Sequence, residues 1–302
     1  MSALFAGIDG GQSSTICVIG DEEGRILARG SSGPADEIGE GPGSTRLHDA
    51  LAGALDDARR HGGLAPDTSY AVIVAGVSGY EGRISGRAPE LPARRLRLVH
   101  DALIAHEGAL AGAPGVVAIA GTGSVVYGRS AGGAERTFGG WGYLLGDEGS
   151  AFHLAREALS ATMRAQDDGD ASLAAASRAA CEFFGALSLR ELARGIYAGE
   201  IDRARIAAFA PAVHDFESLA PIAQRGAERI AALVAAAVRA GAAPSVALCG
   251  GAFSSPSYAR RVRAAIEAAS GAAVVEPRYD PACGALLLAY REGGIAPGEL
   301  RW

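Results

Sequence analysis

Two short turns that are rich in glycine and hydroxyl residues each follow a predicted strand, one turn in each half of the chain. The first spans residues 9–14 and reads DGGQSS, and the second spans residues 121–124 and reads GTGS. Glycine lets backbone N–H groups come close to an oxyanion, and serine and threonine hydroxyls add donors. Either turn alone is more common as a plain hairpin. Facing each other as a matched pair, the two turns predict a polyphosphate site that needs no lysine.

Two aspartates stand at the ends of predicted strands, where they could act on a bound phosphate. Asp9 ends the first strand, and a carboxylate there is costly unless it is hydrogen-bonded or paired with a cation, so a role with Mg²⁺ is natural. The alternative is a turn-capping aspartate. Asp101 follows a short strand and precedes a helix, so it is either a general base or a helix N-cap. Residue types alone leave both alternatives open.

The densest group of functional residue types lies at residues 139–151, which read GGWGYLLGDEGSA. Glycines surround Trp141, and Asp147 and Glu148 precede a long predicted helix. Polar sugars are commonly held by stacking on tryptophan and by hydrogen bonds to carboxylates. A helix-capping Asp–Glu pair is the alternative, but it leaves the flanking glycines unexplained.

Strands and helices in a repeated order must position these residues. Each half of the chain reads as three strands in a meander, followed by helices that alternate with further strands. The predicted elements are strands at residues 4–8, 15–19, 25–28, 70–77, 96–99, 115–120, 125–129, 135–138 and 246–249, and helices at residues 44–60, at 101–112 and from Pro256, with Ser255 as its N-cap. Residues 30–43 are interpreted as a glycine-rich loop, and the arginines at 94–97 as a solvated loop ahead of a strand. This order is typical of an α/β protein made of two similar halves.

The composition excludes several classes of function. The chain has 302 residues, enough for two domains, and 49% of them are hydrophobic. All 28 basic residues are arginines, which excludes a lysine-dependent phosphate loop and Schiff-base chemistry. A net charge of −6 argues against nucleic acid as a partner. Because no apolar run is long enough to cross a membrane and the four cysteines form no CxxC pair, we expect a cytoplasmic protein without a membrane partner.

The chain resembles the N-acetylglucosamine kinases, which are sugar kinases of the actin, hexokinase and heat-shock chaperone superfamily. Residues 9–13 match the first phosphate motif of this family, residues 121–124 match the second, and residues 249–253 (CGGAF) match the adenosine motif. Residues 139–151 are the most specific match. Together the matched segments run from residue 4 to about residue 290, so the resemblance covers the whole chain.

The resemblance implies an α/β fold of two ribonuclease H-like (actin-like ATPase) domains with an interdomain cleft. The N-terminal domain would comprise residues 1–113 and be completed by a C-terminal helix at residues 281–302. The second domain would comprise residues 114–280. The resemblance also implies ATP and Mg²⁺ as cofactors, a small-molecule sugar as substrate and a homodimer as the assembly.

The resemblance further assigns roles to individual positions. Asp101 matches the catalytic aspartate that takes the proton from the sugar hydroxyl, and Asp9 matches the acid associated with Mg²⁺. The positions expected to bind the nucleotide are Gly10, Gly11, Gln12, Ser13, Ser14, Thr122, Gly123, Gly250 and Gly251. The positions expected to contact the sugar are Asp36, Gly123, Ser124, Gly140, Trp141 and Asp147. The implied activity is ATP-dependent phosphorylation of an amino sugar at O6, with N-acetylglucosamine as the expected substrate.

Asp36 departs from the family pattern, because kinases of this family present an asparagine to the sugar from this loop. A carboxylate accepts hydrogen bonds but cannot donate as an amide does, and it favours a cationic 2-amino group over an acetamide. Free glucosamine is therefore an alternative substrate. Two other classes of function stay open: an activator ATPase of a reductase or dehydratase, which would carry an iron–sulfur cluster on paired cysteines, and an actin-like nucleotide switch. Residues 166–216 contain no motif that indicates a function.

Overall fold

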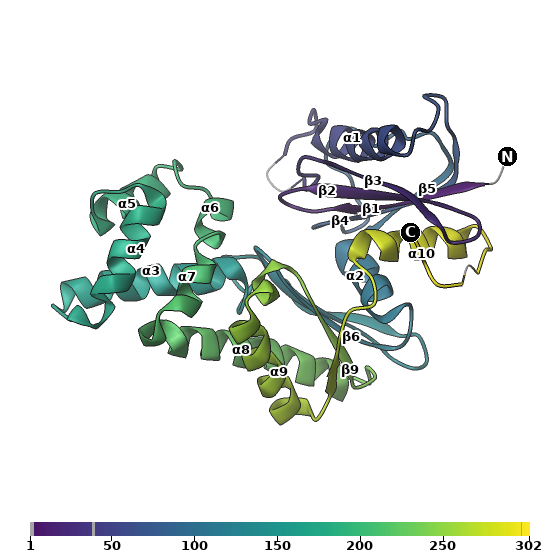
Figure 1. The fold of residues 1–302 in the computed structure, drawn as a ribbon. Helices are drawn as coiled ribbons and strands as arrows, with labels where there is room; N and C mark the ends of the chain where they lie inside the picture. The colour runs from purple at the N-terminus through teal and green to yellow at the C-terminus, as the bar shows by residue number, and fades with distance from the viewer. Residues whose placement is uncertain (1–2, 38–39, 297) are drawn as a thin grey trace. The chain divides into compact units, whose positions relative to one another are not determined.

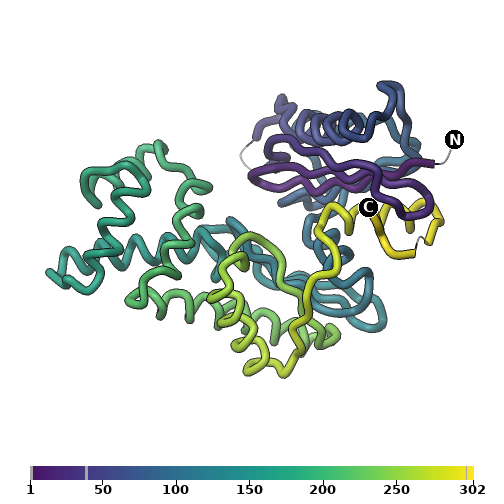
Figure 2. The backbone as a smooth tube through the Cα atoms, in the orientation of Figure 1, coloured from purple at the N-terminus to yellow at the C-terminus, as the bar shows by residue number. Residues whose placement is uncertain are grey.

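The computed structural model describes residues 3–37, 40–296 and 298–302. The chain divides into two compact units, of which the first comprises residues 1–113 and 276–302 and the second comprises residues 114–275. The C-terminal segment, yellow in Figure 2, belongs with the purple N-terminal strands. It joins them from residue 276, ahead of the expected residue 281.

The first unit is built on a five-stranded sheet in the order β3-β2-β1-β4-β5. Its strands are β1 (Leu4–Gly10), β2 (Thr15–Asp21), β3 (Ile26–Ser32), β4 (Tyr70–Val77) and β5 (Ala93–His100), and its helices are α1 (Arg46–His61), α2 (Asp101–Leu110) and α10 (Pro281–Glu292). The first three strands pair antiparallel, as the predicted meander requires, and β4 and β5 add parallel strands beyond β1. Asp9 therefore lies in the central strand, between Ile16 of β2 and Gly76 of β4.

Helices cover both faces of this sheet, with α1 on one face and α10 on the other (Figure 1). The apolar side of α1 faces the sheet, because Leu47, Leu51 and Leu55 recur every four residues and are buried. The contact of α10 with β1 is much closer, since a Cβ at Gly7 would lie 2.1 Å from the backbone nitrogen of Leu286. Glycine alone permits this approach of helix and strand.

The last helix is shorter than the sequence predicts. It ends at Glu292 and does not continue to residue 302, so the expected helix at residues 281–302 is wrong in its second half. Gly293 and Gly294 follow, and Gly294 has a φ of 72°, a conformation that ends the helix. The tail then reaches an isolated bridge between Arg25 and Arg301. Residue 297, which falls in the expected helix, lies outside the described residues.

The second unit repeats the strand order of the first. Its sheet has the order β10-β9-β6-β7-β8, with β6, β7 and β8 antiparallel and β9 and β10 parallel to β6. The strands are β6 (Gly115–Ala120), β7 (Ser124–Arg129), β8 (Glu135–Gly139), β9 (Ser245–Cys249) and β10 (Ala273–Val275). The helices are α3 (Ala151–Asp167), η1 (Ala171–Leu173), α4 (Ala174–Phe184), α5 (Leu189–Tyr197), α6 (Arg203–Ala207), α7 (Ala210–Asp215), η2 (Glu217–Leu219), α8 (Ala220–Arg239), η3 (Gly251–Ser254) and α9 (Pro256–Ser270). The predicted repetition of one plan in two halves is confirmed.

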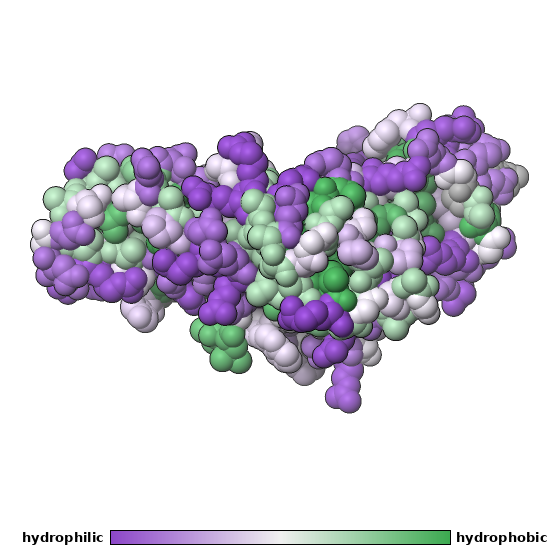
Figure 3. Space-filling view, turned by 90° about the horizontal axis from the view of Figure 1, so that it is seen from below, coloured by the Kyte–Doolittle hydropathy of each residue, from purple (hydrophilic) through white to green (hydrophobic). Residues whose placement is uncertain are grey.

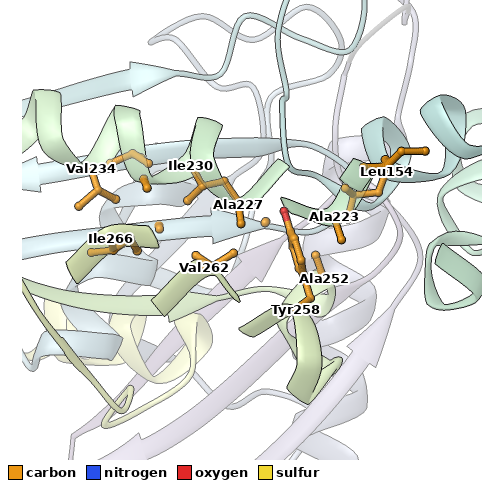
Figure 4. Close-up of a cluster of buried hydrophobic side chains, with 14 of the residues drawn as sticks. Leu154, Ala223, Ala227, Ile230, Val234, Ala252, Tyr258, Val262 and Ile266 are labelled. Carbon is orange, nitrogen blue, oxygen red and sulfur yellow. The ribbon is translucent and has the colours of Figure 1, made fainter. Parts of the chain in front are cut away.

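The main core of the second unit lies where α8 and α9 pack on its sheet (Figure 4). Leu154 of α3, Ile230 of α8 and Val262 of α9 are all buried in it. Tyr258 of α9 is also fully buried, and its hydroxyl donates a hydrogen bond of 2.8 Å to the carbonyl oxygen of Gly149. This bond fixes the end of the predicted sugar motif to the core.

The residues without a readable motif, 166–216, form helices α4 to α7 and part of a second apolar cluster. Leu192 and Phe209 are buried in this cluster together with Phe152 and Leu159 of α3. Helices α4, α6 and α7 each lie against α3. The segment is therefore packed on the helix that begins directly after the predicted sugar motif.

Two segments that the sequence predicts as loops are strands in the structure. Residues 30–32 complete β3, where Gly30 lies so close to α1 that a Cβ would come within 2.0 Å of the backbone nitrogen of Ala58. Residues 94–97 belong to β5, and both Arg95 and Arg97 form ion pairs with Glu292 of α10. The predicted loop at these arginines is wrong because the strand begins at Ala93 and pairs with β4, although the arginine side chains are exposed to solvent as predicted.

Three features of the structure bear on the expectations drawn from the composition: its helices, its surface and its cysteines. No helix among the described residues is both long and apolar enough to cross a membrane. Hydrophilic side chains cover much of the face seen in Figure 3, and hydrophobic side chains form smaller groups between them. The structure describes all four cysteines, and each is free.

Candidate functional site

The first predicted phosphate turn connects β1 to β2. The amide of Gly11 donates a hydrogen bond of 2.9 Å to the carbonyl oxygen of Ser14 and closes the turn. The side chains of Ser13 and Ser14 are exposed, so their hydroxyls are available to an oxyanion. The structure thus brings together the expected nucleotide positions Gly10, Gly11, Gln12, Ser13 and Ser14 next to Asp9.

Asp9 lies among other charged groups of the first unit. Its pKa is raised to about 7, first by burial and then by the carboxylates of Asp101 and Asp280, while the guanidinium of Arg29 opposes the shift. Arg29 also pairs with Asp280, since Nη1 of Arg29 lies 2.5 Å from Oδ2 of Asp280. The structure therefore places the predicted metal-associated acid and the predicted base within electrostatic reach of each other.

Asp101 begins α2, but it is not the N-cap that the sequence left as an alternative. His100 occupies the cap position, with its Nδ1 3.1 Å from the amide nitrogen of Ala102 and 2.8 Å from Oδ1 of Asp101. One ring nitrogen cannot accept from an amide and donate to a carboxylate at once, and we assign the proton to Nδ1 because the shorter contact is to the charged group. The side chain of Asp101 remains 28% exposed, so a substrate hydroxyl can reach it.

The loop that carries Asp36 is bound to the first turn. The amide of Ala35, which is fully buried, donates a hydrogen bond of 3.0 Å to the carbonyl oxygen of Gly11. Asp36 itself is 9% exposed, and its Oδ1 lies 3.9 Å from Nη1 of Arg46 in α1. Asp36 is therefore next to the phosphate turn, and its carboxylate faces a cation of its own unit.

The second predicted phosphate turn connects β6 to β7 and is bonded to the predicted sugar motif. The amide of Ala151 donates to the carbonyl oxygen of Gly121 at 2.8 Å, and the hydroxyl of Ser124 donates to the carbonyl oxygen of Glu148 at 2.9 Å. Thr122 and Gly123 lie between these anchored residues. Two motifs that are separate in the sequence thus form one structure in the second unit.

Asp147 lies where these segments meet. It is 5% exposed and has a φ of 58°, a left-handed conformation that few non-glycine residues adopt and that aspartate tolerates better than most. Backbone amides of Ser124 and Gly142 donate hydrogen bonds to its side chain. A Cβ at Gly123 would lie 2.8 Å from Oδ2 of Asp147, so the turn can approach this carboxylate only because it has glycine there.

Trp141 lies in the glycine-rich loop that follows β8. It is flanked by Gly140 and Gly142, whose φ angles are 72° and 81°. Its side chain is 76% exposed, which is unusual for a large apolar ring. The indole face is therefore available for stacking against a sugar ring.

The expected adenosine turn follows β9. Gly250 has a φ of 106°, and a Cβ there would lie 2.5 Å from the carbonyl oxygen of Ala120, the last residue of β6. Gly251 begins η3, and a Cβ at this position would meet nothing within 4 Å. The turn therefore lies beside the strand end from which the second phosphate turn begins.

The first unit offers a carboxylate that suits a magnesium ion bound together with phosphate. Within the described part of the chain, no group of three or more His, Cys, Asp or Glu side chains could hold a metal ion. Magnesium typically binds one or two carboxylates and completes its shell with phosphate oxygens and water. Asp9 fits this role, because a carboxylate whose pKa is raised by burial gains most from a nearby cation.

Three charged residues that act on Asp9 or Asp147 were not predicted from the sequence. Asp280 caps α10 by accepting a hydrogen bond of 2.9 Å from the amide of Cys283, and its place ahead of a proline at a helix start was a readable signal. Arg29 lies on β3 and pairs with Asp280. Arg203 of α6 lies with Nη2 3.1 Å from Oδ2 of Asp147. No pattern in the sequence indicates these two arginines.

Comparison with known proteins gives amino-sugar kinases as relatives. The N-acetylmuramic acid/N-acetylglucosamine kinase of Clostridium acetobutylicum is 38% identical over 73 residues, which is 24% of each chain. The N-acetyl-D-glucosamine kinase of Dictyostelium discoideum is 28% identical over 178 residues, which is 54% of this chain and 55% of that protein. The matched part thus spans about half or less of these curated relatives.

A solved structure matches nearly the whole chain. It is that of a candidate N-acetylglucosamine kinase from Chromobacterium violaceum, with 28% identity, a TM-score of 0.77, and coverage of 95% of this chain and 99% of that one. The two-domain fold of actin-like ATPases predicted from the sequence is therefore confirmed.

A family model also matches across both units. It covers residues 6–289 and describes the BadF/BadG/BcrA/BcrD ATPase family. The match includes both phosphate turns, the loop around Trp141 and the turn at Gly250. The chain belongs to the BadF/BadG/BcrA/BcrD ATPase family.

Proposed function

We propose that this protein is an ATP-dependent kinase that phosphorylates an amino sugar at O6, with N-acetylglucosamine as the substrate. The observation that carries the proposal is the hydrogen bonding of the phosphate turn at residues 121–124 to the loop at residues 139–151. This loop presents an exposed tryptophan and a buried carboxylate, the two groups suited to a sugar ring. The names of the relatives support the same substrate class.

The proposed mechanism gives each group of the first unit one task. Asp101 accepts the proton of the sugar 6-hydroxyl as that oxygen forms a bond to the γ-phosphorus of ATP and the bond to the bridging oxygen of ADP breaks. Its partial exposure and its place at the end of β5 suit a general base, which contributes about 10²–10⁴-fold to a rate. The turn at residues 10–14 supplies amides and hydroxyls for the phosphates. Phosphoryl transfer depends mainly on such positioning.

ATP and Mg²⁺ are the proposed cofactors. Membership of an ATPase family supports ATP, and Asp9 would hold the magnesium ion that accompanies its phosphates and neutralises their charge. Gly250 and Gly251 are proposed to border the adenosine. A cytoplasmic location and a homodimer complete the proposal, and light scattering on the purified protein tests the assembly.

Two other functions compete with this one. Glucosamine as the substrate is favoured by one observation, the aspartate at position 36, whose carboxylate suits a cationic amino group. An activator ATPase would need paired cysteines for its cluster, whereas the cysteines here are widely separated in the sequence. The kinase proposal therefore stands first.

One experiment tests the proposal directly. ADP release is followed in a coupled assay with MgATP and a panel of N-acetylglucosamine, glucosamine, N-acetylmannosamine, N-acetylmuramic acid and glucose. The proposal expects the highest kcat/KM for N-acetylglucosamine and a product phosphorylated at O6, as read by NMR. ADP release that no sugar stimulates would reject a sugar kinase, and a preference for glucosamine would reject the named substrate alone.

A further inference from the structure

Arg203 of helix α6 contacts the carboxylate of Asp147 in the predicted sugar motif. Arg203 is the first residue of α6, which Asp202 caps by accepting from the amide of Arg205. Its Nη2 lies 3.1 Å from Oδ2 of Asp147, and the Asp147 side chain is only 6% exposed. A segment of the chain with no readable motif thus contributes directly to the loop that we propose as the sugar site.

Two aromatic rings fix the position of this arginine. The guanidinium carbon of Arg203 lies 4.9 Å from the ring centre of Tyr143 and 5.8 Å from that of Phe152. These rings meet edge to face, with centroids 5.4 Å apart and planes at 81°. A cation placed over ring faces is attracted electrostatically, so the guanidinium is held by three side chains from the loop and from α3.

Arg203 and the phosphate turn converge on the same carboxylate. A Cβ at Gly123 would lie 2.8 Å from Oδ2 of Asp147 and 3.1 Å from Nη2 of Arg203. A carboxylate has about four acceptor positions, and the hydrogen bonds from Arg203, Ser124 and Gly142 leave capacity for a ligand hydroxyl. Arg203 therefore orients the Asp147 carboxylate and leaves at least one of its acceptor positions for a ligand hydroxyl.

The protonation state of Asp147 also depends on its contact with Arg203. Burial raises the pKa of Asp147, and the charge of Glu148 raises it further, whereas the backbone amide of Ser124, the guanidinium of Arg203 and the amide of Gly142 lower it. A protonated Asp147 would be a poorer acceptor for sugar hydroxyls. Among the described residues, Arg203 is the cation that lowers the pKa of Asp147, so its loss disfavours the ionised form.

We propose that Arg203 is a positioning residue of the sugar site, which fixes the Asp147 carboxylate as an acceptor for hydroxyl groups of the sugar. This inference rests on the proposed kinase function and gives helix α6 a part in positioning the substrate site. Residue 203 acts through Asp147 and need not touch the sugar.

Three variants separate this role from a structural one. Arg203→Met removes the charge and keeps much of the stem, and Arg203→Lys keeps the charge without the planar guanidinium. Arg205→Met is the matched control, because Arg205 lies on the same short helix and over the ring of Phe183 at 4.3 Å, away from Asp147. Each variant is also made on an Asp147→Asn background.

Arg203→Met is expected to raise KM for the sugar about ten-fold or more, as the loss of a charged hydrogen bond implies, with KM for ATP within about two-fold. Arg203→Lys should recover part of the loss, and Arg205→Met should match the wild type. The acid limb of kcat/KM for the sugar should move to higher pH in Arg203→Met. On the Asp147→Asn background the same change should have little further effect.

A measurement without substrate separates failure of this inference from failure of the proposed function. The carboxyl carbon of Asp147 is titrated by ¹³C NMR in the wild type and in Arg203→Met, and the variant should titrate at higher pH. An unchanged titration, or sugar kinetics unchanged in Arg203→Met while the wild type is an active sugar kinase, overturns the inference and leaves the kinase proposal intact. A wild type that binds and phosphorylates no sugar overturns the proposed function and this inference together.

Discussion

Nδ1 of His100 lies 2.8 Å from Oδ1 of Asp101 at the junction of β5 and α2. The hydrogen bond to Asp101 raises the pKa of His100, and the charges of Asp101 and Glu81 act in the same direction against the opposing effect of burial. The imidazolium therefore persists to higher pH than in an isolated histidine. The residue at the N-cap position of α2 therefore places a positive charge 2.8 Å from the proposed base.

The His100–Asp101 contact predicts a pH-dependent contribution to stability. A histidine whose pKa is higher in the folded state stabilises the fold fully below its unfolded pKa, about 6.5, and this stabilisation is lost as the pH rises through the folded value. His100→Ala should therefore lower the midpoint of thermal unfolding more at about pH 5.5 than at about pH 9. Asp101→Asn should remove most of this pH dependence. If His100→Ala lowers the midpoint of thermal unfolding by the same amount at both pH values, the assignment of the proton to Nδ1 is wrong.

Asp101 itself is expected to govern turnover and not nucleotide binding. Asp101→Asn keeps the shape of the side chain but cannot take a proton, so kcat should fall by about 10²–10⁴-fold. ATP affinity, measured by calorimetry without sugar, should stay within about two-fold of the wild type. A variant that keeps most of the wild-type kcat would refute the role of Asp101 as the base.

Asp9 is expected to destabilise the metal-free protein at alkaline pH. Its pKa is raised from 3.8 to about 7, so the fold favours the protonated acid, and stability that is present below 3.8 is lost as the pH rises through about 7. Asp9→Asn mimics the neutral acid and should unfold at a higher temperature than the wild type at about pH 8.5 in EDTA, with the difference vanishing towards pH 4.

Magnesium provides the control for the Asp9 prediction. Because a cation favours the ionised carboxylate, adding MgATP should stabilise the wild type at neutral pH more than it stabilises Asp9→Asn. If MgATP stabilises Asp9→Asn as much as it stabilises the wild type, Asp9 has no role in binding the metal.

The parts of the fold and site that the sequence predicted are those set by local patterns. The buried strand at Tyr70–Val77 and the Ser255–Pro256 helix start were readable, because alternation, apolar runs and capping residues act over a few positions. The turn at residues 121–124 was also readable from its glycines. Each of these features is decided by neighbours in the sequence.

The missed features depend on contacts between distant segments. Arg203 meets Asp147 across 56 positions, and Arg29 meets Asp280 across 251. The sequence predicts a loop at Gly30 because it does not show that α1 lies against this residue. Such pairings follow from tertiary packing, which no local window contains.

Trp141 is expected to matter for the sugar and hardly at all for stability. Its side chain is 76% exposed, so Trp141→Ala removes little buried surface and should change the free energy of unfolding by no more than about 0.5 kcal/mol. Loss of ring stacking, worth about 0.5–1.5 kcal/mol, should raise KM for the sugar by roughly 2–10-fold. Trp141→Phe should recover part of the effect. If KM for the sugar stays at the wild-type value, this tryptophan does not contact the substrate.

Asp36 is expected to decide between an acetamido and an amino group at C2 of the sugar. Its carboxylate lies beside the first phosphate turn, with Arg46 of α1 at 3.9 Å, so a substrate ammonium group would compete with a cation of the protein for it. Asp36→Asn supplies the amide donor that an acetyl oxygen can use, and removes the charge that attracts an ammonium group. The ratio of kcat/KM for N-acetylglucosamine to that for glucosamine should therefore rise by about ten-fold. Arg46→Met keeps the carboxylate and frees it from its cation, and this control should shift the ratio the opposite way, towards glucosamine. Ratios that do not move in either variant would show that Asp36 is only a loop residue and that another group reads the C2 substituent.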